Sequence, residues 1–160
     1  FYFSFLHFSF LFIILVILIN INNSHDIALD AAGNVHIVGN ARAGNYDLDP
    51  GPGTLMQTRV ENHATGFVLK LDTNGNLVWG GSLVTTDTHS ECLGTTVDSS
   101  GNLYVTGQDI TIFDPSGEPI ASIGIPEPPA NLTFGGRDGT TLFITARTSL
   151  YRVDMRVTGQ

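Results

Sequence analysis

The stretch Asp30–Gly39 (DAAGNVHIVG) decides the fold, because its pattern of Asp, Gly-Asn and final Gly returns in Asp98–Gly107 (DSSGNLYVTG). A third copy begins at Asp72 (DTNGNLVW), and looser copies begin at Asp114 (DPSGEPI) and Asp138 (DGTTLFI). Each copy has an apolar run before the Asp, a polar turn, and an alternating run after it. Glycine and asparagine tolerate positive φ, and the Asp carboxylate can accept hydrogen bonds from the amides of its own turn. The pattern therefore predicts repeated β-hairpins.

The runs beside these turns have the composition of strands. They are four or five residues long and rich in β-branched and aromatic residues, as in Phe67–Leu71, Leu103–Thr106, Ile110–Phe113 and Leu142–Thr145. No stretch after Asn22 has a 3.6-residue apolar period long enough for a packed helix. Pairs of hairpins form four-stranded units, which we expect over residues 26–84, 91–125 and 130–160. The fold class is therefore all-β, an incomplete β-propeller of about two and a half blades over residues 26–160.

A closed propeller needs more chain than this. Four blades of about forty residues require roughly 160 residues, and fewer remain once the apolar start of the chain is set aside. Two and a half blades would leave sheet edges and one blade face open to water. We therefore expect the chain to be a fragment of a longer propeller. The alternatives for covering the open edges are missing blades of the same protein or self-association of several copies.

Residues 1–25 differ in composition from the rest of the chain. Residues 1–21 contain no charged side chain, and twenty-one helical residues reach about 31 Å, enough to cross a membrane. This segment predicts a signal peptide or transmembrane anchor, and hence a secreted or membrane-anchored, extracytoplasmic protein. The alternative is a spurious translation, since the segment lacks an initial Met, a basic start and a small-residue cleavage site. Any membrane contact is expected only through residues 1–21.

Charge and cysteine content exclude several classes of function. The 160 residues include 7 Lys+Arg and 15 Asp+Glu, a formal net charge of −8. Nucleic-acid binding needs a basic face, so no nucleic-acid partner is expected. The single cysteine, Cys92, excludes an intrachain disulfide and a cysteine zinc site. We expect Cys92 to be a small buried hydrophobic residue in a strand, and the single tryptophan, Trp79, to be a core residue at the end of a strand.

The C-terminal part of the sequence resembles a known family. Its ordered elements are Val97–Gly107, Ile112–Gly117, Ile125–Glu127, Ala130–Gly136, Thr141–Ala146 and Ser149–Val153. This succession is similar to the end of the gluconolactonase / senescence-marker-protein (regucalcin-like) family of six-bladed propellers. The resemblance implies a calcium-type divalent ion at the propeller centre and metal-dependent hydrolysis of sugar lactones. Such an ion would polarise the lactone carbonyl and activate or position a water molecule.

The metal ligands of that family do not carry over to this sequence. The family places an Asp-Gly pair ahead of the Asp-turn, where its Asp reaches the metal, and here the pair is Leu93-Gly94. The motifs that hold the family's Glu and Asn ligands are not found. Asn131, in the run ANLTFGG, is the single matching polar residue and the candidate for substrate binding, although a structural role is the more usual one. This chain is therefore expected to be inactive by itself, while its parent is expected to be a lactone hydrolase, with the ion in the full-length protein.

The N-terminal part resembles a second family, the SBBP bacterial β-propeller repeat. The similar residues are Asp30–Gly39, Tyr46–Gly53 and Gly66–Asp72, continuing to Trp79. This resemblance implies an exported, non-catalytic propeller that acts as a binding or display module. It is the alternative function.

One further candidate metal site lies in a loop. Asn45, Asp47 and Asp49 place three oxygen-bearing side chains at alternate positions, as in the first half of a calcium loop. An EF-hand would need Gly where Pro50 stands and Glu where Met56 stands. The pattern is more typical of a Pro/Gly-rich surface loop. The five histidines show no metal-ligand spacing and suggest no catalytic role.

Overall fold

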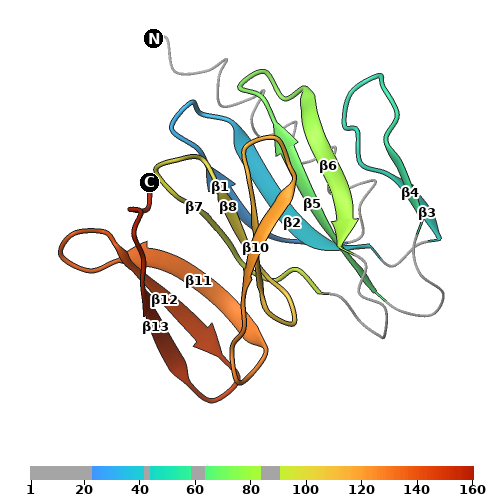
Figure 1. The fold of residues 1–160 in the computed structure, drawn as a ribbon. Coiled ribbons are helices and arrows are strands. Elements are labelled where there is room, and N and C mark those ends of the chain that lie inside the picture. Colours follow the sequence, from blue (N-terminus) through green and yellow to red (C-terminus); the bar gives the residue numbers. More distant parts are fainter. Residues whose placement is uncertain (1–22, 42–43, 59–63, 84–90) are drawn as a thin grey trace, which may run out of the picture.

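The computed structural model describes residues 23–41, 44–58, 64–83 and 91–160, and these residues form strands and turns only (Figure 1). Within this part of the chain, no helix is long and apolar enough to cross a membrane. The predicted signal or anchor, residues 1–21, lies outside the described residues. Residues 23–25, which the sequence assigned to that segment, belong to the first strand.

The first sheet has four antiparallel strands in the order β1-β2-β5-β6. Its strands are β1 (Asn23–Leu29), β2 (Val35–Ala41), β5 (Thr65–Leu71) and β6 (Leu77–Leu83). Between β2 and β5 the chain forms a separate hairpin of β3 (Asn45–Asp47) and β4 (Met56–Thr58). Leu48, in the loop of this hairpin, is buried against Ile37 and Leu69 of the first sheet. The hairpin therefore covers part of one face of that sheet.

The second and third sheets continue the repeat. The second contains β7 (Thr95–Val97), β8 (Leu103–Thr106), β9 (Ile110–Phe113) and β10 (Pro119–Ile123), with each strand paired antiparallel to the next. The third contains β11 (Pro129–Gly135), β12 (Thr141–Ala146) and β13 (Leu150–Asp154). The prediction of an all-β chain with four-stranded antiparallel sheets is confirmed for the described residues.

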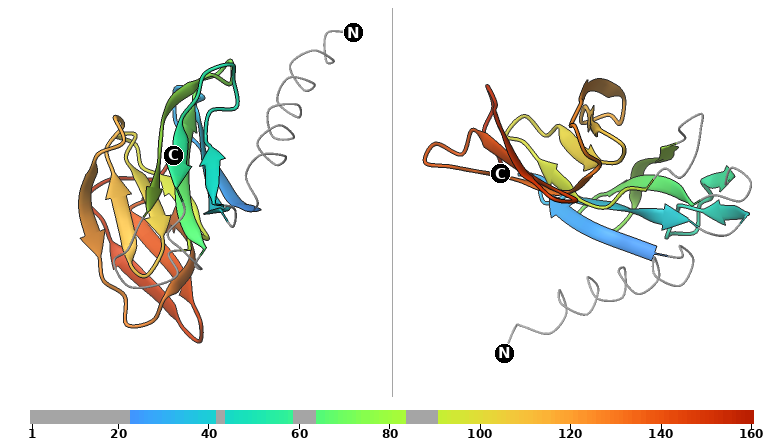
Figure 2. Two further views of the ribbon diagram at one scale, coloured as in Figure 1. Left: turned by 90° about the vertical axis from the view of Figure 1, so that its right-hand side faces the viewer. Right: turned by 90° about the horizontal axis from the view of Figure 1, so that it is seen from below.

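The three sheets lie side by side like vanes, with their first strands toward one another (Figure 2). Strand β7 contacts both β1 and β11, so the inner strands of all three sheets meet. One apolar cluster joins the first and second sheets, and it includes Val38, Val68, Val105 and Phe113. A second cluster joins the second and third sheets, and it includes Ile110, Ile112, Leu132 and Ile144. This radial packing is the architecture of neighbouring propeller blades.

Four of the five predicted turns are built as the sequence indicates. In each turn, Oδ1 of the initial Asp accepts hydrogen bonds from the backbone amides two and four residues ahead, at 2.8–3.1 Å. These residues are Asp30, Asp72, Asp98 and Asp114. The glycine three residues after the Asp has positive φ, between 81° and 94°. The reversal therefore depends on one carboxylate and one glycine. The fifth copy differs, because Gly136 and Gly139 form that turn, with a hydrogen bond from the Gly139 amide to the Gly136 carbonyl.

Candidate functional site

The two positions that the family resemblance singled out lie next to each other. Leu93 and Gly94 precede the inner strand β7, and Asn131 lies in the neighbouring inner strand β11. A Cβ atom on Gly94 would lie 2.7 Å from Oδ1 of Asn131 and 2.8 Å from its Cα. Gly94 is therefore required for the close approach of the two segments. The structure brings Leu93-Gly94 and Asn131 together where two blades meet.

The polar atoms around this point join one blade to the next. Asp26 of β1 accepts the Thr95 amide through Oδ2 at 2.8 Å and the Ile27 amide through Oδ1 at 2.9 Å. The Cys92 amide donates to Oδ1 of Asn40 in β2 at 2.9 Å. The contacts to Thr95 and Cys92 connect residues more than fifty positions apart. The first blade therefore holds the segment that leads into β7.

We tested whether the residues present could hold the divalent ion that the family implies. Leu93 occupies the expected ligand position and has no oxygen to donate. Asp26 uses both carboxylate oxygens on backbone amides, and Oδ1 of Asn131 accepts the Leu132 amide at 2.7 Å. No group of three His, Cys, Asp or Glu side chains within the described ranges is arranged to bind a metal ion. The donor set at the inner strands of this chain does not fit a divalent cation.

Cys92 stands close to this point and is not a nucleophile. Its side chain is 1% exposed, and burial raises the pKa of the thiol to about 12. A thiol with such a pKa is protonated at neutral pH and does not react. The prediction that it is buried is confirmed. The prediction that it lies in a strand is wrong, because residues 91–94 form an irregular segment held by Asn40 and Thr106 before β7 begins.

The second predicted metal site lies elsewhere, on the β3–β4 hairpin at the far side of the first sheet from β11 (Figures 1 and 2). Asp47 accepts the amides of Asp49 and Leu55 through Oδ1, at 3.0 and 2.7 Å. Asp49 accepts the Gly51 amide at 2.8 Å. Asn45 is exposed at the start of β3. The carboxylates of this loop hold its backbone, as expected for a Pro/Gly-rich surface turn.

A buried charged cluster in the first blade was not predicted. Oδ2 of Asp30 lies 3.1 Å from Nζ of Lys70 and 3.4 Å from Nε2 of His36. All three side chains are less than 9% exposed. Hydrogen bonds from Asn34 and Lys70 hold the pKa of Asp30 far below its usual value, against the effect of burial. Burial and the Lys70 charge lower the pKa of His36 to about 4, so this histidine is neutral at pH 7.

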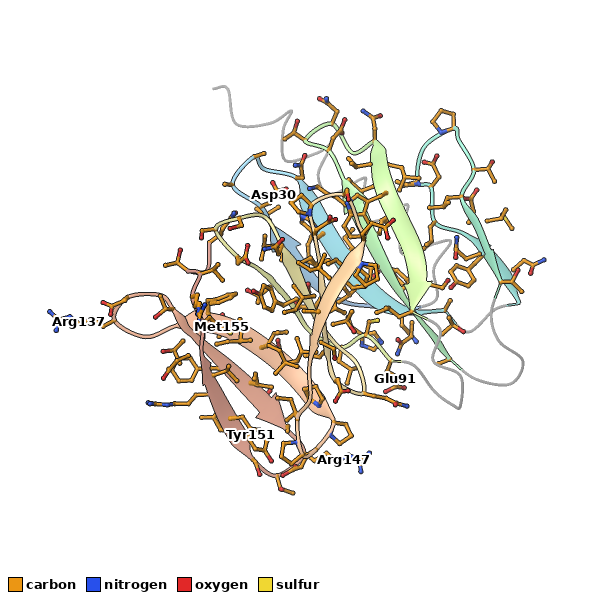
Figure 3. The ribbon with its side chains drawn as sticks, in the orientation of Figure 1. Asp30, Glu91, Arg137, Arg147, Tyr151 and Met155 are labelled. Atoms are coloured by element: carbon orange, nitrogen blue, oxygen red, sulfur yellow. The ribbon has the colours of Figure 1, made fainter. Side chains whose placement is uncertain are left out.

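The register of the first sheet explains this cluster. His36 of β2 pairs with Lys70 of β5, and Lys70 pairs with Trp79 of β6, so the three side chains share one face. Asp30 reaches them from the β1–β2 turn, where Figure 3 labels it. One feature of the sequence could have indicated this contact. His36 lies six residues after the turn residue Asp30, and Tyr104 lies six residues after the turn residue Asp98. Tyr104 likewise donates to its turn Asp, at 3.1 Å.

Glu127 is a second residue whose role the sequence did not reveal. Its carboxylate accepts hydrogen bonds from the Thr148 amide and from the hydroxyls of Thr148, Ser149 and Tyr151, at 2.6–3.2 Å. These donors lower the pKa of Glu127 to about 2. The carboxylate ties the segment before β11 to the β12–β13 turn. All four of its contacts are within the third blade, so the role is structural.

Comparison with known proteins identifies the family. The family model of the SMP-30/gluconolactonase/LRE-like region matches residues 40–148. This match includes much of the segment that resembles SBBP repeats, and the SBBP resemblance remains a prediction. A search of curated protein sequences gave no significant match.

Two solved structures show the same fold. A calcium-binding regucalcin from Agrobacterium tumefaciens is 15% identical, with a TM-score of 0.53, over 88% of this chain and 48% of that protein. A luciferin-regenerating enzyme is 19% identical, with a TM-score of 0.50, over 86% of this chain and 63% of that protein. A third protein, whose description is "putative gluconolactonase", is 18% identical, with a TM-score of 0.47, over 87% of this chain and 60% of that protein. This chain thus spans less than two thirds of each of these three proteins. The chain belongs to the SMP-30/gluconolactonase/LRE-like family.

Proposed function

We propose that this chain is part of a gluconolactonase-like β-propeller and supplies blades rather than the reactive centre. The observation that supports this most directly is the occupation of the family's metal-ligand position by Leu93. Asp26, which contacts Thr95 at the start of β7, has both carboxylate oxygens bonded to backbone amides. The polar groups of the inner strands therefore stabilise blade packing, and the chain alone is inactive.

The parent protein is proposed to be a divalent-metal-dependent lactone hydrolase. Membership of the family and the short span of this chain against its solved relatives support this. One of those relatives is described as calcium-binding. The ion and the groups that handle the proton and the lactone carbonyl would come from residues outside the three described blades. The described blades would position that centre through the contacts from Asp26 to Thr95 and from Asn40 to Cys92.

The test is hydrolysis of D-glucono-1,5-lactone, followed by proton release at constant pH. The 160-residue chain is expected to give the uncatalysed rate both with added calcium and with a chelator. A longer protein from the same gene, containing further blades, is expected to accelerate hydrolysis and to lose that acceleration on chelation. Metal-dependent catalysis by the 160-residue chain would contradict the proposal. A longer protein that is inactive with calcium, zinc and manganese would remove the lactonase assignment.

The alternative proposal is an exported, non-catalytic propeller that binds or displays a partner. Leu93 favours it, since a side chain without an oxygen atom does not support a hydrolytic metal centre. Localisation tests the alternative, because the alternative requires the apolar segment 1–21 to direct export. Fractionation of cells that express the tagged full sequence is expected to place it outside the cytoplasm. Recovery in the cytoplasmic fraction would contradict the alternative.

Open sheet edges require a partner in either case. The third sheet has three strands, whereas the other two have four, and β13 forms its edge. Added blades or a second copy could pair with this edge. Sedimentation equilibrium distinguishes the two possibilities, because self-association raises the molar mass of the 17.2 kDa chain with concentration.

A further inference from the structure

A groove separates the outer parts of the first and second blades, away from the inner strands. It has a volume of about 470 Å³ and lies between β6 and the β9–β10 turn. Its lining includes Trp79, Gly81 and Leu83 from the first blade and Phe113 and Glu118 from the second. None of these residues takes part in the contacts among Leu93, Gly94 and Asn131.

Trp79 is held in place on one wall of the groove. Its Nε1 donates to the Pro115 carbonyl of the neighbouring blade at 3.1 Å, so the indole N–H is already bonded. The ring lies 6.2 Å from the ring of Phe113, at an angle of 31°. Gly117 packs against the ring, since a Cβ there would lie 2.7 Å from Cδ2. His36 packs edge-on against the same ring, with centroids 6.1 Å apart. The part of Trp79 that lines the groove therefore offers ring carbons rather than a hydrogen-bond donor. Trp79 lies inside β6 and not at its end, which corrects the prediction from sequence.

Gly81 opens the groove beside this ring. It is two residues after Trp79 and two before Leu83, so all three positions face the same side of β6. A Cβ atom at Gly81 would meet no atom within 4 Å, whereas one at Gly80 would lie 3.2 Å from Leu69. Glycine inside a strand weakens it and often marks a place where another group approaches closely. Here it leaves space between Trp79 and Leu83.

The charge in and around the groove is negative. Glu118 is exposed, and its side chain forms no hydrogen bond or ion pair with any other described residue. No Lys or Arg is among the groove's lining residues. Lys70, the cross-strand neighbour of Trp79, is paired with Asp30 at 3.1 Å, so its charge is balanced. All the basic residues after Lys70 lie in the third blade or just after it: Arg137, Arg147, Arg152 and Arg156. Figure 3 shows Arg137 and Arg147 at opposite ends of the third sheet. The groove thus combines a fixed aromatic ring with an uncompensated carboxylate.

We propose that this groove binds a small organic ammonium ion. The cation would lie against the Trp79 ring in the space that Gly81 leaves, with the Glu118 carboxylate as its counter-charge. Tryptophan has the strongest cation–π attraction of the aromatic side chains. The apolar walls, Val68, Leu83 and Phe113, favour alkyl groups on the nitrogen over a strongly hydrated metal ion. One carboxylate is too few for a metal site, whereas it can neutralise a single organic cation.

The probe is choline, compared with 3,3-dimethylbutan-1-ol, which replaces the nitrogen by carbon and has no charge. Trp79 is the single tryptophan of the chain, so its fluorescence reports directly on the groove. Saturation-transfer NMR of the choline methyl protons gives a second readout that does not depend on the tryptophan. Choline is expected to change the Trp79 emission with saturation in the millimolar range, and the neutral alcohol to bind more weakly.

Two variants and a control test the residues. Glu118→Gln is expected to weaken choline binding about two- to fivefold, the size of an exposed charge pair. Gly81→Val fills the open space and is expected to abolish saturation, while far-UV circular dichroism stays as in the wild type. Asp154→Asn removes the same charge from β13, outside the groove, and is expected to leave binding unchanged.

Two results would overturn the proposal. Equal binding of choline and the neutral alcohol would show an apolar groove without preference for charge. Choline binding that survives Gly81→Val in the folded variant would place the cation elsewhere. Neither result bears on the proposed lactonase parent, because none of the groove residues lies among the inner strands.

Discussion

The turn residue Asp98 provides the sharpest test of how the blades are held together. Its side chain is 0% exposed and accepts four hydrogen bonds. Oδ1 binds the Ser100 and Asn102 amides at 2.8 and 2.9 Å, and Oδ2 binds Nδ2 of Asn102 and the Tyr104 hydroxyl at 2.9 and 3.1 Å. The perturbation is Asp98→Ala, which removes the two oxygens that accept all four bonds. Of the donor residues, Tyr104 is buried and Asn102 half-buried, whereas Ser100 is exposed.

The expected cost follows from these four bonds. A hydrogen bond contributes about 1 kcal/mol net, and a buried donor left without a partner costs about 1–3 kcal/mol. Backbone relaxation and water entry would recover part of this. Asp98→Ala is therefore expected to lower the free energy of unfolding by about 3–4 kcal/mol. The Tyr104 ring packs edge-on against Phe134 of the third blade, with centroids 5.3 Å apart, so the loss should reach the neighbouring sheet.

Asp72→Ala is the matched control within the same molecule. Asp72 accepts the amides of Asn74 and Asn76 and the side chain of Asn76 at 2.8–2.9 Å, which is the same turn at the surface. Its donors can turn to water when the carboxylate is lost, so a clearly smaller destabilisation is expected. Urea unfolding monitored by circular dichroism gives both values from the midpoint and the slope. With a slope of about 2 kcal/mol per molar, Asp98→Ala should lower the midpoint by roughly 1.5–2 M.

Equal destabilisation by the two variants would refute this reasoning. It would show that the turns act locally and that burial against Tyr104 adds nothing. A third variant, Tyr104→Phe, removes one of the four bonds and keeps the ring, with an expected cost of about 1 kcal/mol. The Asp98→Ala, Tyr104→Phe double variant should cost less than the sum of the two, because both remove the same bond.

Three further predictions follow from the described contacts. The pKa of His36 is about 4 in the folded protein, below its ordinary value of 6.5. As the pH drops, the unfolded chain therefore binds a proton at His36 before the folded protein does. The free energy of unfolding should fall between pH 6.5 and pH 4. Urea midpoints across that range should show the fall, and His36→Gln should flatten it. Gly117→Ala should lower the thermal unfolding midpoint strongly, because φ is 94° and the new Cβ would lie 2.7 Å from Cδ2 of Trp79. Gly81→Ala should leave the midpoint nearly unchanged, because a Cβ there meets no atom within 4 Å. Cys92 should stay unmodified by a maleimide in the native protein and react once urea unfolds it, whereas reaction at the native rate would contradict its burial.

The turns and strands could be predicted because their chemistry is local. Each Asp binds amides two and four residues ahead, and the glycine that permits positive φ is three residues ahead. A sequence shows such spacings directly. The alternation of Asn45, Asp47 and Asp49 was equally visible, but it does not reveal that the carboxylates bind the backbone of their own loop.

The contacts between blades could not be derived from spacing. Asp26 and the Thr95 amide meet across sixty-nine positions, and this meeting depends on the relative placement of two sheets. The buried position of His36 depends on β2 lying between β1 and β5, which in turn requires the β3–β4 hairpin to leave the sheet. Leu93 and Asn131 were singled out through the family resemblance, and only the packing of β7 on β11 explains why they adjoin.

The most direct test of the account is whether the first two blades pack through their inner strands in solution. Nuclear Overhauser effects on a labelled sample can show this at two defined points. Blades packed in this way should give cross-peaks from the Thr95 amide to the Asp26 side chain and from the Cys92 amide to the Asn40 side chain, alongside the pairings within each sheet. Sheets with intact internal cross-peaks but none at either point would mean that the blades fold apart, and the account would be wrong.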